Sequence, residues 1–124
     1  MKMVDFYDQG LNMHRTLSEW VVERDGFYYQ RTSNVPFTGT VWGNEEGSIR
    51  NGKREGEWRF YHKTRLDSKT NYKKGKREGE WVQYHKNGQI EAKGFSKNDK
   101  HEGELIWYHE NGKLALKGTF KDGK

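Results

Sequence analysis

The heptapeptide GKREGEW occurs twice in this chain, letter for letter, at residues 52–58 and 75–81. A third copy is altered to DKHEGEL at residues 99–105, and a fourth begins with Gly123 and Lys124, the last two residues of the sequence. The heptapeptide is therefore part of a repeated unit rather than a single motif.

Each of the three copies continues into an aromatic segment, which reads GEWRFYH, GEWVQYH or GELIWYH. The separation is 23 residues from Gly56 to Gly79 and 24 residues from Gly79 to Gly103. Periods of about 20 to 50 residues are typical of stacked architectures, in which each unit packs on its neighbours. We therefore predict a stack of small units with a period of 23–24 residues.

Each unit has the pattern of one β-hairpin. The GKREG turn precedes a strand of about six residues, and a second turn, Asn87 and Gly88 or Asn111 and Gly112, precedes a return strand. The pair AsnGly between two apolar runs is a strong hairpin signal, because both central residues of a type I′ turn need positive φ. The first unit lacks this pair. The predicted return strands are residues 66–72, 90–95 and 114–120.

Side chains alternate between the two faces of a strand, so stacked hairpins place like residues in rows. One face is predicted to carry a tyrosine row and the other a tryptophan row. The rows are Tyr61, Tyr84 and Tyr108 on one face and Trp58, Trp81 and Leu105 on the other. We predict an all-β chain, a single-layer antiparallel sheet of stacked hairpins with one face left for another molecule to cover.

The chain divides into three predicted parts. Residues 47–124 hold about three regular hairpins and a truncated fourth, and residues 23–46 form a degenerate leading repeat. Residues 1–22 are a poorly defined cap for the first strand, whose backbone groups would otherwise be unpaired. The period of this segment is ambiguous, and a short helix or a strand is left open for Leu17, Trp20, Val21 and Val22.

The composition limits both the core and the chemistry. Only 31% of the residues are hydrophobic, but 15% are aromatic. Burial must therefore come largely from aromatic side chains, which suits a thin sheet better than a thick core. The chain has no cysteine, which excludes a disulfide framework, a cysteine-ligated zinc site and a thiol nucleophile.

The N-terminus does not have the pattern of a signal peptide. It carries Asp5 and Asp8 where an unbroken apolar segment is needed, and no later stretch approaches about 18 consecutive apolar residues. We therefore expect a cytoplasmic protein, and an export signal that was trimmed before residue 1 is left open.

The net charge of +5 is unevenly distributed. Residues 1–46 hold 4 basic and 7 acidic side chains, whereas residues 47–124 hold 19 basic and 11 acidic ones. Basic surfaces attract acidic proteins, nucleic acid or anionic lipid. Glutamates interrupt the basic turns, so no continuous positive groove for nucleic acid is evident, and no amphipathic membrane anchor is visible. We therefore expect neither nucleic acid nor a membrane as partner.

The sequence shows no pattern typical of an enzyme. Histidines recur at His62, His85 and His109, but equivalent positions in successive hairpins lie two strands apart, at about 9 to 10 Å. Zinc ligands must each approach one ion to about 2 Å. No nucleophile motif or phosphate-binding loop is present. We predict no enzymatic activity, no cofactor and no metal.

The units NGKREGEWRFYH and KGKREGEWVQYHKNGQIEAKGF resemble the bacterial variant of the MORN repeat, whose members form an elongated, twisted antiparallel sheet of hairpins. The leader ERDGFYY at residues 23–29, followed by VPFTG at residues 35–39, resembles the module that opens many short bacterial members described as antitoxins. The resemblance covers about residues 23–124. It implies an antitoxin or immunity protein that binds and neutralises a toxin. Because Leu105 replaces a tryptophan and the first unit lacks AsnGly, no contact residue is carried over.

Protein binding is the function that the sequence favours, with a cognate toxin as the partner implied by the resemblance. Interface hot spots are enriched in Trp, Tyr and Arg. The predicted partner-binding residues are Arg54, Arg59, Tyr61, Arg77, Tyr84, Trp107 and Tyr108, with Arg54 and Arg77 at the rim. The alternatives are a scaffold that self-assembles through its open last strand and an array that binds nucleic acid or a lipid surface. The oligomeric state is left open.

Overall fold

A computed structural model describes residues 2–6, 13–16, 21–24, 27–30 and 36–124 of the chain. These residues form a long, open antiparallel sheet and a separate two-stranded sheet, β3–β4. The strands are β1 (Lys2–Phe6), β2 (Met13–Thr16), β3 (Val21–Arg24), β4 (Phe27–Gln30), β5 (Gly39–Gly43), β6 (Glu45–Arg50), β7 (Lys53–His62), β8 (Arg65–Lys73), β9 (Lys76–Tyr84), β10 (Ile90–Lys97), β11 (Lys100–His101), β12 (Gly103–Tyr108) and β13 (Leu114–Phe120).

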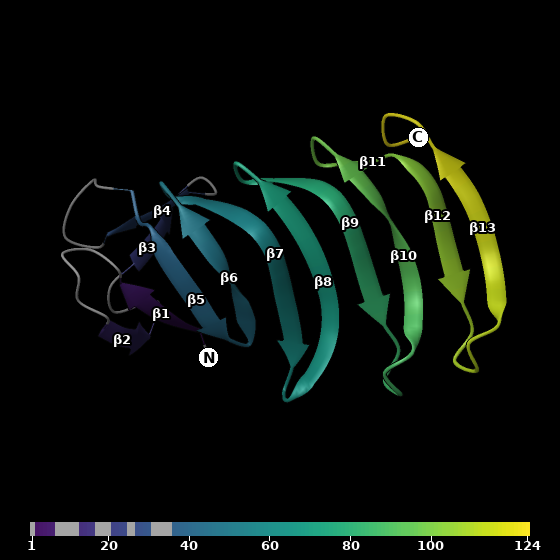
Figure 1. The fold of residues 1–124 in the computed structure, drawn as a ribbon, viewed down its shortest axis with the longest axis horizontal. Helices are drawn as coiled ribbons and strands as arrows, with labels where there is room; N and C mark the ends of the chain where they lie inside the picture. The colour runs from purple at the N-terminus through teal and green to yellow at the C-terminus, as the bar shows by residue number, and fades with distance from the viewer. Residues whose placement is uncertain (1, 7–12, 17–20, 25–26, 31–35) are drawn as a thin grey trace.

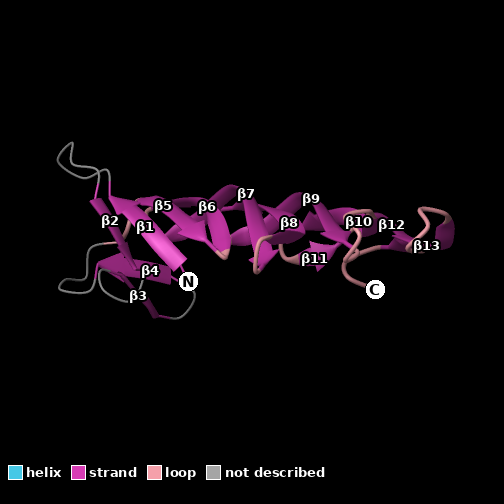
Figure 2. Cartoon of the chain, turned by 90° about the horizontal axis from the view of Figure 1, so that it is seen from below, coloured by secondary structure: helices cyan, strands magenta, loops and turns pink. Residues whose placement is uncertain are grey.

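The long sheet has the order β13-β12-β10-β9-β8-β7-β6-β5-β1-β2, with β11 paired to β10. Figure 1 shows the strands side by side along one axis, with the N-terminal strands at one end and β13 at the other. Figure 2 shows the sheet edge-on as a single layer, with β3–β4 on one side of it near the N-terminal end. The predicted all-β, single-layer sheet of stacked hairpins is confirmed.

The N-terminal segment is made of strands where the structure describes it. Strand β1 pairs with β5, and β2 pairs with β1, so this hairpin continues the sheet beyond β5. Val21 and Val22 begin β3, whereas Leu17 and Trp20 lie outside the described residues. The predicted division at residues 22 and 46 stays a prediction.

The tight turns lie at the GKREG end of the hairpins and not at the AsnGly pairs. Both central residues have positive φ at Asn51 and Gly52, Lys74 and Gly75, Asn98 and Asp99, and Asp122 and Gly123. In the AsnGly loops only the glycines do, as at Gly88 with φ 88°. The type I′ prediction was therefore wrong there. The loop after β9 is longer: the N–H of Gly88 donates to His85 O at 2.9 Å, and the N–H of His85 donates to Gln89 O at 2.7 Å.

The glutamate in the middle of GKREGEW joins each unit to the next. Glu55 Oε2 accepts a hydrogen bond from the backbone N–H of Lys74 at 3.0 Å. Equivalent bonds join Glu78 to the N–H of Asn98 at 2.7 Å and Glu102 to the N–H of Asp122 at 3.0 Å. Because each turn is held by the preceding unit, the repeated motif has a structural role.

At the N-terminal end, the leading segment takes the place of a preceding unit. The N–H of Asn51 donates to Thr38 Oγ1 at 2.9 Å, and the N–H of Gly52 donates to Phe37 O at 2.7 Å. The N–H of Tyr28 in turn donates to Gly52 O at 2.8 Å. These bonds fix the side chains of Tyr28 and Phe37 over the first part of the sheet.

The main cluster of buried side chains includes these two residues and side chains of the strands beneath them. It consists of Tyr28, Phe37, Val41, Ile49 and Trp58. Trp58 is 1% exposed, and its Nε1–H donates to Ser48 O at 3.0 Å. The indole lies so close to Gly47 that a Cβ at that position would be 2.3 Å from the ring. The sheet therefore has a compact core at its N-terminal end, over β5 to β7.

Candidate functional site

The strand register sorts the side chains onto two faces, as predicted. The tryptophan face carries the row Trp58, Thr70, Trp81 and Gly94 and the row Phe60, Ser68, Gln83, Ala92, Trp107 and Leu116. The tyrosine face carries the row Arg59, Lys69, Val82, Lys93, Ile106 and Lys117. Tyr28 and Phe37 cover the N-terminal part of the tryptophan face.

The predicted partner-binding residues are divided between these faces. Four lie on the tyrosine face, namely Arg59, Tyr61, Tyr84 and Tyr108, and three lie on the tryptophan face, namely Arg54, Arg77 and Trp107. A partner docked on one side of a single-layer sheet contacts one face, so the seven do not form one site. Their binding roles stay predictions, and the geometry of each face decides which group is favoured.

On the tyrosine face, charged side chains are paired with rings and with opposite charges. Lys69 Nζ lies 6.0 Å from the centre of the Tyr84 ring, and Lys93 Nζ lies 5.7 Å from the centre of the Tyr108 ring. Lys69 Nζ is also 3.7 Å from Glu57. A hydrogen bond with Tyr61, and then the charge of Glu57, raises the pKa of Arg59. The cations of this face are thus already paired with neighbours on the same face.

Arg54 fills the tryptophan face of the first unit. Its guanidinium carbon lies 4.5 Å from the centre of the Trp58 ring and 5.3 Å from that of Tyr72. Its Nη2 donates to Glu45 Oε1 at 2.8 Å and to the Tyr28 hydroxyl at 3.2 Å. Burial by itself lowers the pKa of Arg54, but the interactions with Tyr28 and Tyr72 outweigh burial, and the pKa is raised. Arg54 therefore belongs to the packed interior.

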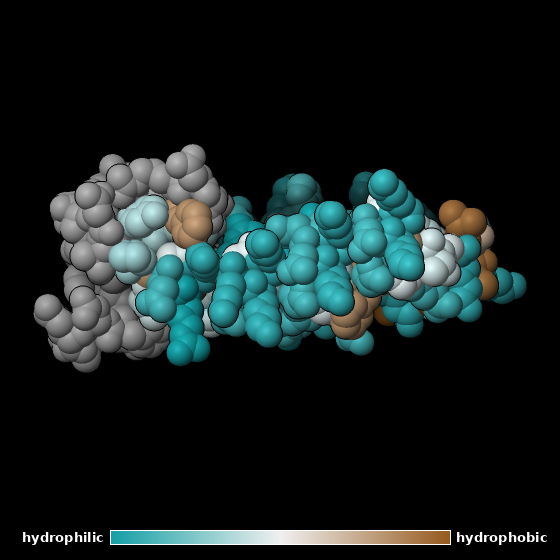
Figure 3. Space-filling view, turned by 90° about the horizontal axis from the view of Figure 1, so that it is seen from above, coloured by the Kyte–Doolittle hydropathy of each residue, from teal (hydrophilic) through white to brown (hydrophobic). Residues whose placement is uncertain are grey.

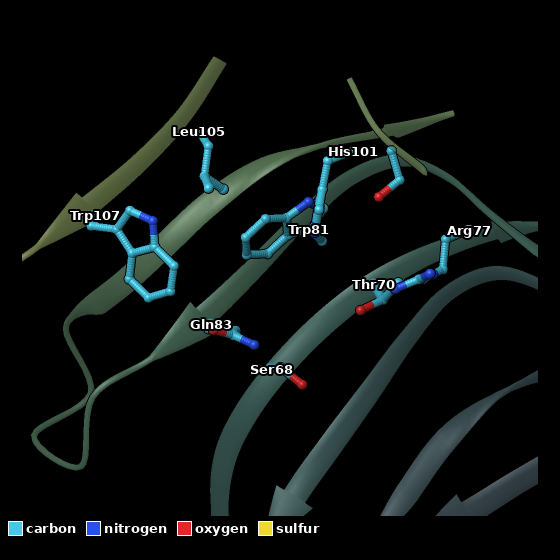
Figure 4. Close-up of a pocket in the computed structure, with 9 residues that line it drawn as sticks. Ser68, Thr70, Arg77, Trp81, Gln83, His101, Leu105 and Trp107 are labelled. Carbon is cyan, nitrogen blue, oxygen red and sulfur yellow. The ribbon is translucent and has the colours of Figure 1, made fainter. Parts of the chain in front are cut away.

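The same face is hollow in the second unit. A groove of about 270 Å³ lies over β8, β9, β10, β11 and β12. Figure 4 shows its aromatic and apolar wall, formed by Trp81, Leu105 and Trp107, and the polar side chains of Ser68 and Thr70 opposite. The lining residues are Ser68, Thr70, Arg77, Trp81, Gln83, Ser96, His101, Leu105 and Trp107.

The groove exists because two positions carry smaller side chains than their equivalents in the first unit. Ser96 pairs with Gly79 as Tyr72 pairs with Gly56, so a serine replaces the ring that packs against Arg54. In the same way Ser68 pairs with Gln83 where Glu45 pairs with Phe60. The residue order in β10 is Phe95–Ser96, whereas β13 has Thr119–Phe120. As a result, the aromatic ring of β10 points to the tyrosine face, where Phe95 is 49% exposed.

The groove contains polar atoms without partners. Within the described part of the chain, Trp81 Nε1 and His101 Nδ1 are buried and make no hydrogen bond. The two rings are neighbours, with centroids 5.5 Å apart. In the first unit the matching indole, Trp58, donates to a backbone carbonyl. An indole N–H is a donor only, so Trp81 Nε1 is left without an acceptor within the described residues.

Arg77 follows the same motif as Arg54 but takes a different position. Its Nη2 donates to Asp99 O at 2.7 Å, and its Nε lies 3.4 Å from Asp99 Oδ1. The side chain is 46% exposed, against 22% for Arg54. Position 68 carries a serine and not the carboxylate that pairs with Arg54 in the first unit. The Arg77 guanidinium is instead bound by Asp99 of the next turn, at the edge of the groove.

Basic residues gather at the turns beside the groove. Lys73 lies opposite Lys76, and Lys97 lies opposite Lys100. Like charges directly opposite each other destabilise a sheet, so these pairs are unfavourable for folding. Figure 3, which looks onto this edge of the sheet, shows it as mainly hydrophilic, with apolar surface at the end where β13 lies. The edge therefore carries four lysines next to the groove, together with the carboxylates of Glu78 and Asp99, which accept hydrogen bonds from the same turns.

His85, the histidine of the second unit, contacts the backbone of the next unit. His85 Nε2 lies 2.8 Å from Tyr108 O, and its Nδ1 lies 3.4 Å from Glu91 Oε2. The contact between His85 and Tyr108 joins the second unit to the third.

Among the residues that the structure describes, no three His, Asp or Glu side chains form a group that could hold a metal ion. No helix in the same residues is long and apolar enough to cross a membrane.

Sequence reasoning did not select Trp81, Ser96 or His101. The available signal was the alignment of the units, which places Ser96 at the position of Tyr72 and Phe120, and His101 at the position of Arg54 and Arg77. Selection by residue type alone favoured Arg and Tyr and could not find a groove that results from a small side chain.

The family profile of the MORN repeat variant matches residues 77–98 and 102–122. These residues form the second and third hairpins, β9–β10 and β12–β13, which line most of the groove. No curated protein and no solved structure matches the chain. MORN repeats are in general binding modules for proteins or membranes. Two hairpins of the continuous sheet are thus similar to repeats of this family.

Proposed function

We propose that this chain is a protein-binding module of the antitoxin or immunity type, which neutralises a cognate bacterial toxin by docking on the open part of its tryptophan face. One observation carries the proposal. The chain covers this face with its own Tyr28 and Phe37 over the first unit, and in the described part of the chain the same face has an open groove over the second and third units. The resemblance of the leader to the opening module of antitoxins supports the finer assignment.

The open part has the composition of an interface centre. Trp81 and Trp107 are only partly buried and lie on one wall, with Arg77 at the edge. Burying a large aromatic or aliphatic side chain completely contributes about 1.5–3 kcal/mol relative to leaving it exposed. Partly exposed indoles in a concave site therefore offer a partner the type of anchor that dominates interface energies.

Co-expression tests this proposal. The product of the gene beside this one is expressed alone, with the wild-type chain and with two variants. Ser96→Phe fills the groove with the ring that the third unit carries as Phe120. Thr119→Phe adds the same ring on the tyrosine face, where the second unit carries Phe95. We expect the neighbour to be toxic, and the wild type and Thr119→Phe, but not Ser96→Phe, to suppress toxicity. A non-toxic neighbour, or equal suppression by both variants, would contradict the proposal.

Self-assembly is the second candidate, and the last strand favours it. In the described part of the chain β13 pairs only with β12, and its Leu114 and Leu116 are 58% and 63% exposed. An unpaired strand edge is a template for another chain. Light scattering over a concentration series separates the candidates, because a scaffold grows with concentration and a strict monomer does not.

A further inference from the structure

We propose that the groove over the second unit is a subsite for the carboxylate of a partner's Asp or Glu, so that the segment recognised on the tryptophan face is acidic. This inference rests on the proposed function and adds the chemistry of the partner.

Among the described residues, the groove is lined by side chains with hydrogen-bond donors and by no Asp or Glu side chain. Trp81 Nε1 is buried and unpaired, and the lining also includes the hydroxyls of Ser68, Thr70 and Ser96. Asp99 accepts hydrogen bonds from Nε and Nη2 of Arg77. Within the described residues, Nη1 of Arg77 remains for a group that enters the groove. A ligand that carries only donors would leave the indole N–H without an acceptor. A carboxylate, which only accepts, can pair with Nη1 of Arg77 and with the hydroxyl groups of the lining.

The first unit shows what a cation needs on this face. There Arg54 lies on the Trp58 ring, with the Glu45 carboxylate at 2.8 Å. The second unit keeps the indole but has Ser68 at the position of Glu45. A partner's Arg or Lys would enter beside Arg77 without this carboxylate. The exchange of Glu45 for Ser68 therefore removes the carboxylate that pairs with a cation in the first unit.

The surroundings of the groove fit an acidic segment. Lys73 and Lys76 lie opposite each other at one adjoining turn, and Lys97 and Lys100 at the next. The field of these basic pairs attracts an acidic partner and raises its association rate. Leu105 and Trp107 form an apolar wall that can hold the methylene groups of a glutamate or an apolar residue beside it. Together they predict an acidic residue next to an apolar one in the partner.

A displayed library of random 12-residue peptides tests this inference. Peptides are selected on the full wild-type chain, with Ser96→Phe used for counter-selection and Thr119→Phe as the matched control. Peptides that bind the wild type and Thr119→Phe, but not Ser96→Phe, are expected to share an Asp or Glu beside an aromatic or aliphatic residue. Replacing that Glu with Gln in a selected peptide should weaken binding about tenfold or more, because a charge-assisted bond is lost.

Two further measurements make the test decisive. Trp81→Phe keeps an aromatic ring but removes the N–H donor, and is expected to weaken binding of the acidic peptide more than binding of its Gln counterpart, because a carboxylate accepts the stronger hydrogen bond. A fluorescent 20-bp DNA duplex serves as the competing polyanion. The inference is overturned if the groove-dependent peptides are neutral or basic, if the Glu to Gln exchange has no effect, or if no groove-dependent peptide is found. It is also overturned if the duplex alone binds and does so equally to Ser96→Phe.

The outcomes separate this inference from the proposed function. If Ser96→Phe abolishes neutralisation of the toxin but the selected peptides are not acidic, the docking face is correct and the carboxylate subsite is wrong. If acidic peptides bind the groove but the toxin is neutralised equally by Ser96→Phe, the subsite is correct and its proposed use in toxin binding is wrong.

Discussion

The two ends of the tryptophan face start from the same heptapeptide and reach opposite states. At the N-terminal end, Arg54 and Tyr28 close over Trp58, which is 1% exposed and has its N–H paired. In the second unit, Trp81 lines a groove and its N–H is unpaired within the described residues. The difference lies in the strands beside the motif, where Tyr72 becomes Ser96 and Glu45 becomes Ser68. GKREGEW thus builds the stack, and the return strands decide where the stack is open.

The largest expected loss in the free energy of unfolding comes from a substitution in the packed N-terminal end of the face. Trp58→Ala removes a fully buried indole and should lower the free energy of unfolding by about 3–5 kcal/mol. Trp81→Ala removes a partly exposed indole from an open groove and should lower it by only about 1–2 kcal/mol. Urea denaturation followed by circular dichroism measures both. Equal losses in the two variants would mean that the two ends of the face are packed alike.

The second comparison concerns the two arginines. Arg54→Ala removes a guanidinium that lies on Trp58 and pairs with Glu45, and should lower the free energy of unfolding by about 2 kcal/mol. Arg77→Ala removes a half-exposed pair with Asp99 and should lower it by less than about 1 kcal/mol. The same denaturation experiment in high salt provides a control. Salt weakens the exposed Arg77–Asp99 pair of the wild type, so the loss caused by Arg77→Ala should become smaller, whereas the loss caused by Arg54→Ala should not. A larger effect at Arg77 would contradict the assigned roles.

The third comparison uses equivalent glycines. A Cβ at Gly47 would lie 2.3 Å from the Trp58 indole, whereas a Cβ at Gly118 would meet nothing within 4 Å. Gly47→Ala should therefore lower the free energy of unfolding by about 1–3 kcal/mol through overpacking. Gly118→Ala should leave it unchanged or raise it by up to about 1 kcal/mol, because a strand glycine loses more entropy on folding. Thermal unfolding of the two variants is enough to rank them.

The smallest expected change in the free energy of unfolding comes from filling the groove. Ser96→Phe should raise the free energy of unfolding by about 1 kcal/mol, because the new ring buries apolar surface in the groove. Thr119→Phe, on the exposed tyrosine face, should change it by less than about 0.5 kcal/mol. A loss of stability in Ser96→Phe would show that the groove cannot accept the ring that Tyr72 provides in the first unit.

Most of the fold could be predicted from the sequence, because the repeat period and the alternation of side chains act locally. The hairpins, the antiparallel order and the separation of the tyrosine row from the tryptophan row all follow from positions within one unit. The type I′ turns were assigned to the wrong end, because Asn87 and Asn111 sit in longer loops that close with a different geometry.

The site was less predictable, because it depends on contacts between units. The cover over Trp58 comes from Tyr28 and Phe37, more than 20 residues away in the sequence. The groove results from a serine on β10 that lets Trp81 and His101 approach. A choice of anchors by residue type placed Arg54 at a rim, whereas the structure packs it against Trp58.

If a partner docks on the open part of the tryptophan face, the indole N–H signals of the chain report the contact directly. In a ¹⁵N-labelled chain, each signal is assigned by a single Trp to Phe variant, and the toxin is then added. We expect large shifts or broadening for Trp81 and Trp107 and an unchanged signal for Trp58. Unchanged Trp81 and Trp107 signals in a saturated complex would contradict docking on this face.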